Sequence, residues 1–400
     1  MSTALLVAFY ILFPILVIYL CHKYPTIDKI GAVIICYAAG ILLGNIGILP
    51  EGSTAKDGPI DLLMTVTIPL SLPLLLFSID IKKWSRLAGK TLLSMALATF
   101  SITVTSFIGY MIFKDALPES WKIAGMLMGV YTGGTPNLAA IGTALKVDPT
   151  TFVMVQTADV IVGSIYILFL VTIAQRVFLL VLPPFKKTGA AGAALSGGEF
   201  TDYAGIFTRK KFFPLLAAFL LSVAIFAFSA GVTFGLPEIL KRIASGFDPE
   251  KYAMFVVAII ILSITTLGIL SSLIPKIRNI DKTFQLGMYI ILIFCTVVGS
   301  LADIGKLFTM APEIMAFVLI GVFATLLLQV LLSIPFKIDA DTTIIVSTSA
   351  ICSPPFVPVV AGALKNKEIV FSGITTGIIG YAIGNYLGIT MGYLYHAFFP

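Results

Sequence analysis

Charged residues are scarce in this chain of 400 residues. Asp, Glu, Lys and Arg together make up 12%, against roughly 25% in soluble domains. Hydrophobic residues make up 58%, and the mean hydropathy is +1.04. This balance indicates an all-α polytopic membrane protein. The net charge of +6 is found in short loops, so it favours an orienting role at the membrane over a nucleic-acid surface.

Residue types that carry metal, redox or nucleotide chemistry are also few. The two histidines stand near opposite ends of the chain, and the four cysteines lack Cys-x-x-Cys spacing. We therefore expect no disulfide framework and no cofactor. His-Glu-x-x-His, grouped carboxylates and phosphate-binding glycine loops are missing, so we expect neither an enzyme nor direct ATP drive. The first apolar run lacks signal-peptide features and is expected to be retained.

Ten apolar runs are long enough to cross about 30 Å of hydrocarbon. They cover residues 4–21, 30–49, 62–80, 91–113, 150–175, 212–233, 252–274, 284–302, 314–336 and 369–395. A polar stretch rich in Gly and Ala separates them into two sets of five, and its composition is typical of a linker. The sequence thus predicts a first half at 1–182, a cytoplasmic linker at 183–211 and a second half at 212–400.

Two further apolar segments are interrupted in the middle. Segment 123–145 contains Thr-Gly-Gly-Thr-Pro-Asn at 132–137, and segment 342–364 contains Ser-Pro-Pro at 353–355. Proline removes a backbone donor and paired glycines weaken a helix, so each segment is expected to break there. At membrane depth, broken backbone persists only where protein or a water-filled cavity covers it.

The two halves align as an internal repeat. Thr135-Pro136 aligns with Pro354-Pro355 at an offset of 355 − 136 = 219, and the same offset pairs residues 144–146 with 363–365, both Ala-Leu-Lys. The Lys-rich loop at 82–90 and the basic linker are both cytoplasmic only if segment 123–145 re-enters. We therefore predict inverted repeats of five helices plus one broken or re-entrant hairpin each, with both termini outside. If the broken segments cross instead, the basic linker faces outward.

Apart from Asp80 at the very end of segment 62–80, Asp159 is the only formally charged residue in these apolar segments. It stands about ten residues into its helix, roughly 14 Å deep. Because an ionisable group at this depth is costly, it predicts a coupling-ion or proton site. Gln156 shares its face, while Thr157 is displaced around the helix. We predict an ion-coupling group of these three residues; the alternative is an Asp held by a hydrogen bond or by a snorkelling lysine.

The interrupted segments are the predicted substrate site. Ends of half-helices attract anionic groups, and unwound carbonyls coordinate cations. The alternative is that the small residues merely permit a kink or close packing. Sodium is the one metal ion that we expect this site to bind. The predicted substrate-binding residues are Thr132, Gly133, Gly134, Thr135, Pro136, Asn137, Ser349, Ser353, Pro354 and Pro355.

The pattern Tyr131-x-Gly-Gly-Thr-x-Asn137-x-x-Ala140 resembles the YjcL-like family of membrane proteins of unknown function. More distantly, the chain is similar to sodium:glutamate symporters within the cation:proton antiporter and anion transporter superfamily. That resemblance implies inverted repeats, a core domain with two broken elements and elevator-type movement. The second break reads Cys-Ser-Pro-Pro at 352–355, not a glycine-rich sequence, so glutamate itself is not implied.

Together these features favour a secondary active transporter in the bacterial inner membrane. It is expected to move a small organic solute, such as a carboxylate, amino acid or short peptide, coupled to sodium or protons. The alternative is a cation:proton antiporter without an organic substrate. Besides lipid and solute, the expected partner is a second copy of the chain, with helices 30–49 and 252–274 as candidate dimer elements.

Overall fold

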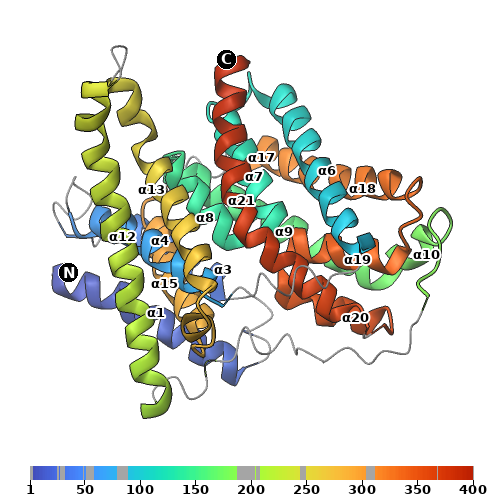
Figure 1. The fold of residues 1–400 in the computed structure, drawn as a ribbon, viewed down its shortest axis with the longest axis horizontal. Helices are drawn as coiled ribbons and strands as arrows, with labels where there is room; N and C mark the ends of the chain where they lie inside the picture. The colour runs from blue at the N-terminus through green and yellow to red at the C-terminus, as the bar shows by residue number, and fades with distance from the viewer. Residues whose placement is uncertain are drawn as a thin grey trace.

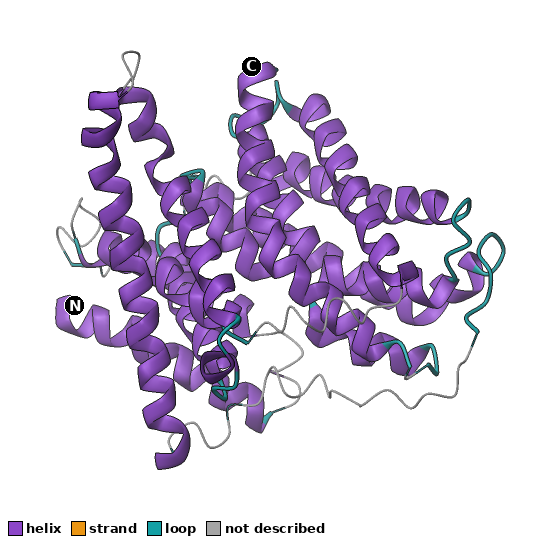
Figure 2. Ribbon diagram, in the orientation of Figure 1, coloured by secondary structure: helices purple, strands orange, loops and turns teal. Residues whose placement is uncertain are grey.

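The computed structural model describes residues 3–24, 27, 32–47, 49–50, 58–78, 89–186, 203, 208–243, 249–302, 311–366 and 368–399. Every regular element in these ranges is a helix (Figure 2). Residues 187–202 and 204–207 of the predicted linker, and most of the Lys-rich loop at 82–90, lie outside the described residues.

Six helices pack together in the part of the molecule that contains the N-terminus (Figure 1). We call them the α4 group: α1 (Thr3–Lys23), α3 (Ala32–Asn45), α4 (Pro59–Leu76), α12 (Arg209–Ile243), α13 (Pro249–Ser272) and α15 (Thr283–Gly299). Each half of the chain contributes three of these helices, and α4 packs along α15 at the centre.

The other part, which we call the α21 group, is built around α21 (Val370–Phe398). Its first-half members are α6 (Gly89–Phe113), α7 (Ser120–Gly133), α8 (Thr135–Ala144), α9 (Pro149–Phe169), the π-helical turn η1 (Leu170–Ala174) and α10 (Gln175–Phe178). The others are α17 (Ala311–Leu319), η2 (Ile320–Ala324), α18 (Thr325–Ser333), α19 (Ala340–Ser347), η3 (Thr348–Cys352), η4 (Pro354–Phe356) and α20 (Val357–Ala363). The short helix α14 (Pro275–Arg278) follows α13.

Seven helices within the described residues are long and apolar enough to cross a membrane. They are Thr3–Lys23, Pro59–Leu76, Gly89–Phe113, Pro149–Phe178, Lys211–Pro237, Phe255–Ser272 and Pro312–Ser333. The prediction of a polytopic all-α membrane protein is thereby confirmed. Helices also form at the other three predicted crossings, but α3 and α15 have only 14 and 17 residues. In α21, glycine, threonine and asparagine dilute the apolar residues over 29 positions.

Each interrupted segment folds back on itself as a helical hairpin. Hairpin 1 comprises α7 and α8, which are joined at Gly134, where φ is +104°. Hairpin 2 comprises α19 with η3, and η4 with α20, and it turns at Ser353, where φ is +83°. In hairpin 1 the arms lie antiparallel, because Gly129 faces Ile141 near the middle and Gly125 faces Leu145 near the open end. The Gly and Pro residues that interrupt this segment therefore form a turn. As a result, the start of α7 and the end of α8 lie close together.

Hairpin 1 is seated on α21 through glycines. Gly125, Gly129 and Gly133 of α7 lie four residues apart, and they face the α21 glycines Gly380, Gly384 and Gly388. A Cβ atom at Gly380 would overlap the carbonyl oxygen of Thr132. Small residues allow such close approach of helix backbones in a membrane, where van der Waals packing replaces the hydrophobic effect.

Candidate functional site

The tips of the two hairpins meet each other. A Cβ atom at Gly134 would overlap the Ser353 hydroxyl oxygen, and the Tyr381 ring of α21 would lie 3.7 Å from it. The Tyr381 hydroxyl interacts in turn with Ser353. Residues more than 200 positions apart therefore form one junction, which is supported from behind by α21.

Asp159 lies beside this junction. Its carboxyl group is half-buried in α9, and it interacts electrostatically with Tyr131 of α7 and with Cys352 of η3. Tyr131 is 1% exposed, and its buried hydroxyl interacts with the Asp159 carboxyl. The one charged residue predicted at membrane depth is thus close to both hairpin tips.

Gln156 supplies a second oxygen on the same side of α9. Its side chain is 2% exposed, and its Oε1 atom has no hydrogen-bond partner among the described residues. Buried carbonyl oxygens normally accept a hydrogen bond or coordinate a cation. Thr157 differs, because it is exposed and its hydroxyl donates to the Val153 carbonyl at 2.8 Å. Gln156 thus has a buried oxygen without a partner one helical turn from Asp159, whereas the Thr157 hydroxyl is bonded within its own helix.

Two of the predicted substrate-binding residues in hairpin 1 donate side-chain hydrogen bonds to backbone carbonyl groups. The Thr132 hydroxyl donates to the Met128 carbonyl at 2.6 Å. Asn137 Nδ2 donates to the carbonyls of Gly129 at 3.3 Å and Gly380 at 3.1 Å. Asn137 thus joins both arms of hairpin 1 to α21. Its amide nitrogen serves the packing of the hairpin, as does Gly133, whose Cα packs on Gly380.

The remaining predicted residues divide by exposure. Three stay half-buried at the tips and are available to a ligand: Thr135, Ser353 and Pro355. Three others are buried: Pro136, Ser349 and Pro354. Among these, Ser349 donates to the Gly373 carbonyl at 2.5 Å, and Pro354 would contact any Cβ at Gly377. Gly134 itself is buried at the junction.

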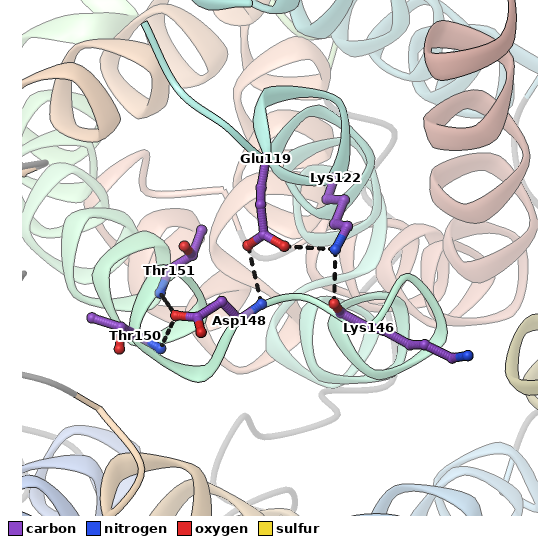
Figure 3. Close-up of polar contacts among 6 residues, drawn as sticks. All are labelled: Glu119, Lys122, Lys146, Asp148, Thr150 and Thr151. Carbon is purple, nitrogen blue, oxygen red and sulfur yellow. Dashed lines mark hydrogen bonds and ion pairs between the residues drawn. The ribbon is translucent and has the colours of Figure 1, made fainter. Parts of the chain in front are cut away.

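A network of charged residues links the two arms of hairpin 1 at the end opposite its turn (Figure 3). Glu119 and Lys122 form an ion pair at 2.6 Å, and Lys122 Nζ donates to the Lys146 carbonyl at 2.8 Å. The second Glu119 oxygen accepts from the Asp148 backbone N–H at 3.0 Å. Asp148 then caps α9 by accepting from the Thr150 N–H at 2.9 Å. The start of α7 is thereby joined to the end of α8 and to α9.

A buried carboxylate links the ends of hairpin 2 on the side opposite its turn. Asp341 is 6% exposed, and it accepts from Gln175 Nε2 at 2.7 Å and from Asn366 Nδ2 at 2.8 Å. Asp341 is therefore a second carboxylate in the α21 group, and it is more deeply buried than the half-buried Asp159. Asp341 stands one residue before the predicted segment 342–364 and was not among the predicted site residues. Lys122 of hairpin 1 lies at the same offset from Asp341 as Thr135-Pro136 from Pro354-Pro355, since 341 − 122 = 219.

Comparison with known proteins places the whole molecule in one family. Residues 11–398 match the model of the family described as "Protein of unknown function (DUF819)". The chain is also 24% identical over 390 residues to the "Uncharacterized membrane protein YjcL" of Bacillus subtilis (strain 168), covering 94% of this chain and 93% of that protein. The prediction of a YjcL-like relationship is confirmed by both matches. The chain is a multi-pass membrane protein that belongs to the DUF819 family.

Proposed function

We propose that this chain is a secondary active transporter that moves a small organic solute, with the transport coupled to movement of sodium ions or protons down their gradient. The observation that carries the proposal is the position of Asp159 next to Tyr131 and Cys352, one from each hairpin tip. Paired discontinuous helices that meet at membrane depth are a typical transporter binding site. A buried carboxylate beside them supplies the group that an ion or proton can neutralise.

Each part of the site has a proposed role. Asp159 binds the coupling cation or proton, and Gln156 Oε1 supplies a further oxygen. Thr135 and Ser353, which stay half-buried at the tips, bind the solute together with the backbone that the two turns leave unpaired. Because a carboxylate in hydrocarbon is costly without a counterion, loading of Asp159 would make movement of the site through the membrane energetically accessible.

Inverted repeats at 1–182 and 212–400 are part of the proposal, and backbone geometry supports them. Gly134 and Ser353 both have positive φ, and 353 − 134 = 219. Lys146 and Lys365 both have φ of +53°, and 365 − 146 = 219. Left-handed backbone is uncommon in residues other than glycine, so its recurrence at one offset favours a shared architecture. The α4 group would be a static scaffold, and the α21 group would move against it as an elevator.

The proposal is tested by thermal unfolding of the purified protein with a panel of cations and small metabolites. A ligand that binds only the folded state raises the melting temperature. We expect a sodium- or pH-dependent shift that one class of organic solute increases, and we expect the Asp159→Asn variant to lose the ion-dependent part. An unchanged ion-dependent shift in Asp159→Asn would remove this role from Asp159.

A second candidate is a cation:proton antiporter. The direct contact between Gly134 and Ser353 favours it, because little space for an organic solute remains between the tips in this state. Asp159 and Gln156 would then exchange a cation for protons. Cation-dependent proton flux in vesicles that contain no organic solute would favour this second function over the first.

A further inference from the structure

The two hairpins differ in how their second arms are covered. On α8, Asn137, Ala140 and Ala144 are at most 1% exposed, and the helix packs against α13, α4 and α15 of the α4 group. On the second arm of hairpin 2, Phe356 at the end of η4 is 42% exposed and Val359 of α20 is 59% exposed. One arm is buried against the α4 group, and the other presents an apolar face.

These two faces are equivalent positions of the proposed repeat. The offset of 219 that relates Gly134 to Ser353 also relates 137 to 356, 140 to 359 and 144 to 363. Ala363 is exposed like Val359, and a Cβ atom at the adjacent Gly362 would meet nothing within 4 Å. The difference in cover therefore extends along the whole face of α20 and is not confined to one side chain.

We infer that the exposed face of α20 is a docking surface for α3 and α15 of the same chain, in a second state in which the face of α8 is released. The inference rests on the proposed transport function. Helices α3 and α15 are the repeat counterparts of α13 and α4, which cover α8 here. An exposed apolar side of α3 contains Leu42, which is 62% exposed, and continues to Ile46, one residue beyond the helix, which is 60% exposed. The observed state is then open on the side of hairpin 2, which the charge distribution predicts to be cytoplasmic.

Two polar bridges hold the α21 group in the observed state. Asn385 Nδ2 donates to Thr265 Oγ1 at 3.2 Å, and the Tyr386 and Thr266 hydroxyls lie 2.7 Å apart. Both bridges join α21 to α13, the same helix that covers α8. Hydrogen bonds between membrane helices are individually weak, so loss of both is expected to shift the equilibrium about fivefold toward the second state.

The inference is tested by labelling with a membrane-impermeant maleimide in vesicles of both orientations. Single cysteines are introduced as Val359→Cys or Ala140→Cys in a background in which the four native cysteines are replaced. We expect Val359→Cys to react from one side only and Ala140→Cys to be protected. A combined variant then carries Thr265→Ala, Asn385→Ala and Tyr386→Phe together. In this variant we expect labelling of Ala140→Cys to rise about fivefold and labelling of Val359→Cys to fall.

The outcomes separate this inference from the proposed function. If Val359→Cys does not react with the aqueous reagent, or if the labelling pattern is the same in every variant, the face of α20 is not a docking surface. Ion-driven flux in the same vesicles would then still support transport. Reciprocal labelling without any flux would overturn the transport proposal alone. Should the combined variant unfold, both positions would react from both sides, and the single Tyr386→Phe variant with its smaller shift takes its place.

Discussion

The two hairpins turn at positions 219 residues apart, and the residues that form the turns differ. Hairpin 1 turns at Gly134, where positive φ carries no steric cost, and its arms are α-helical. Hairpin 2 adopts a similar turn at Ser353 and reaches it through the π-helical stretch Thr348–Cys352. A side chain in this backbone region costs about 1–3 kcal/mol, and π-helical turns are frequent at functional sites. The difference indicates that hairpin 1 is built for close packing, whereas hairpin 2 holds strain near Asp159.

The largest expected effect comes from breaking the packing of hairpin 1. Gly380→Ala places a Cβ atom against the Thr132 carbonyl, which is backbone and has little freedom to move. We expect the free energy of unfolding to fall by about 3 kcal/mol, at the upper end of the usual cost of overpacking. The measurement is a thermal or denaturant melt in detergent. Gly163→Ala is the matched control, because nothing lies within 4 Å of its Cβ position; an equal loss in both variants would contradict the packing argument.

We expect an intermediate effect on stability from substitutions at the ends of the hairpins opposite their turns. Asp341→Ala leaves the buried amide of Asn366 and the half-buried amide of Gln175 without their acceptor, so we expect a loss of about 2 kcal/mol in unfolding free energy. Lys122→Ala at the equivalent place removes a partly exposed ion pair, which is expected to cost less than about 1 kcal/mol. Melting both variants side by side gives the comparison. Equal losses would mean that the two ends are closed equally well.

The smallest expected effect isolates the strain in hairpin 2. Ser353→Ala and Ser353→Gly both remove the hydroxyl that interacts with Tyr381, but only glycine relieves the positive φ. We therefore expect the glycine variant to be more stable than the alanine variant by about 1 kcal/mol. Two variants of equal stability in a melting experiment would show that Ser353 holds no strain.

Local chemistry made part of this architecture predictable from the sequence. Gly-Gly-Thr-Pro and Ser-Pro-Pro interrupt apolar segments, and the turns occur at Gly134 and Ser353 within those sequences. Asp159 was identifiable because a single charge in a long apolar run is conspicuous. Its side of α9 followed from helical periodicity, which also set Thr157 apart from Gln156.

Contacts between distant parts of the chain were not predictable. Asn137 reads as a ligand from its position at the break, but its amide nitrogen bonds to Gly380, 243 residues away. Asp341 lies just outside the predicted segment 342–364, yet the Gln175 and Asn366 side chains both donate hydrogen bonds to it. The glycines of α7 and α21 are visible in the sequence, but their spacing does not predict that these two helices pack against each other. Each case depends on tertiary packing, which periodicity does not encode.

Gradient-driven flux in proteoliposomes tests most directly the claim that Asp159 is the coupling group between the hairpin tips. The wild type, Asp159→Asn and Asp341→Asn are compared under sodium and pH gradients, with the solutes that stabilise the protein in the thermal panel. The account predicts flux in the wild type and in Asp341→Asn, and a loss of at least about tenfold in Asp159→Asn, equivalent to roughly 1.4 kcal/mol. Flux in Asp159→Asn that follows the ion gradient as strongly as in the wild type would contradict it.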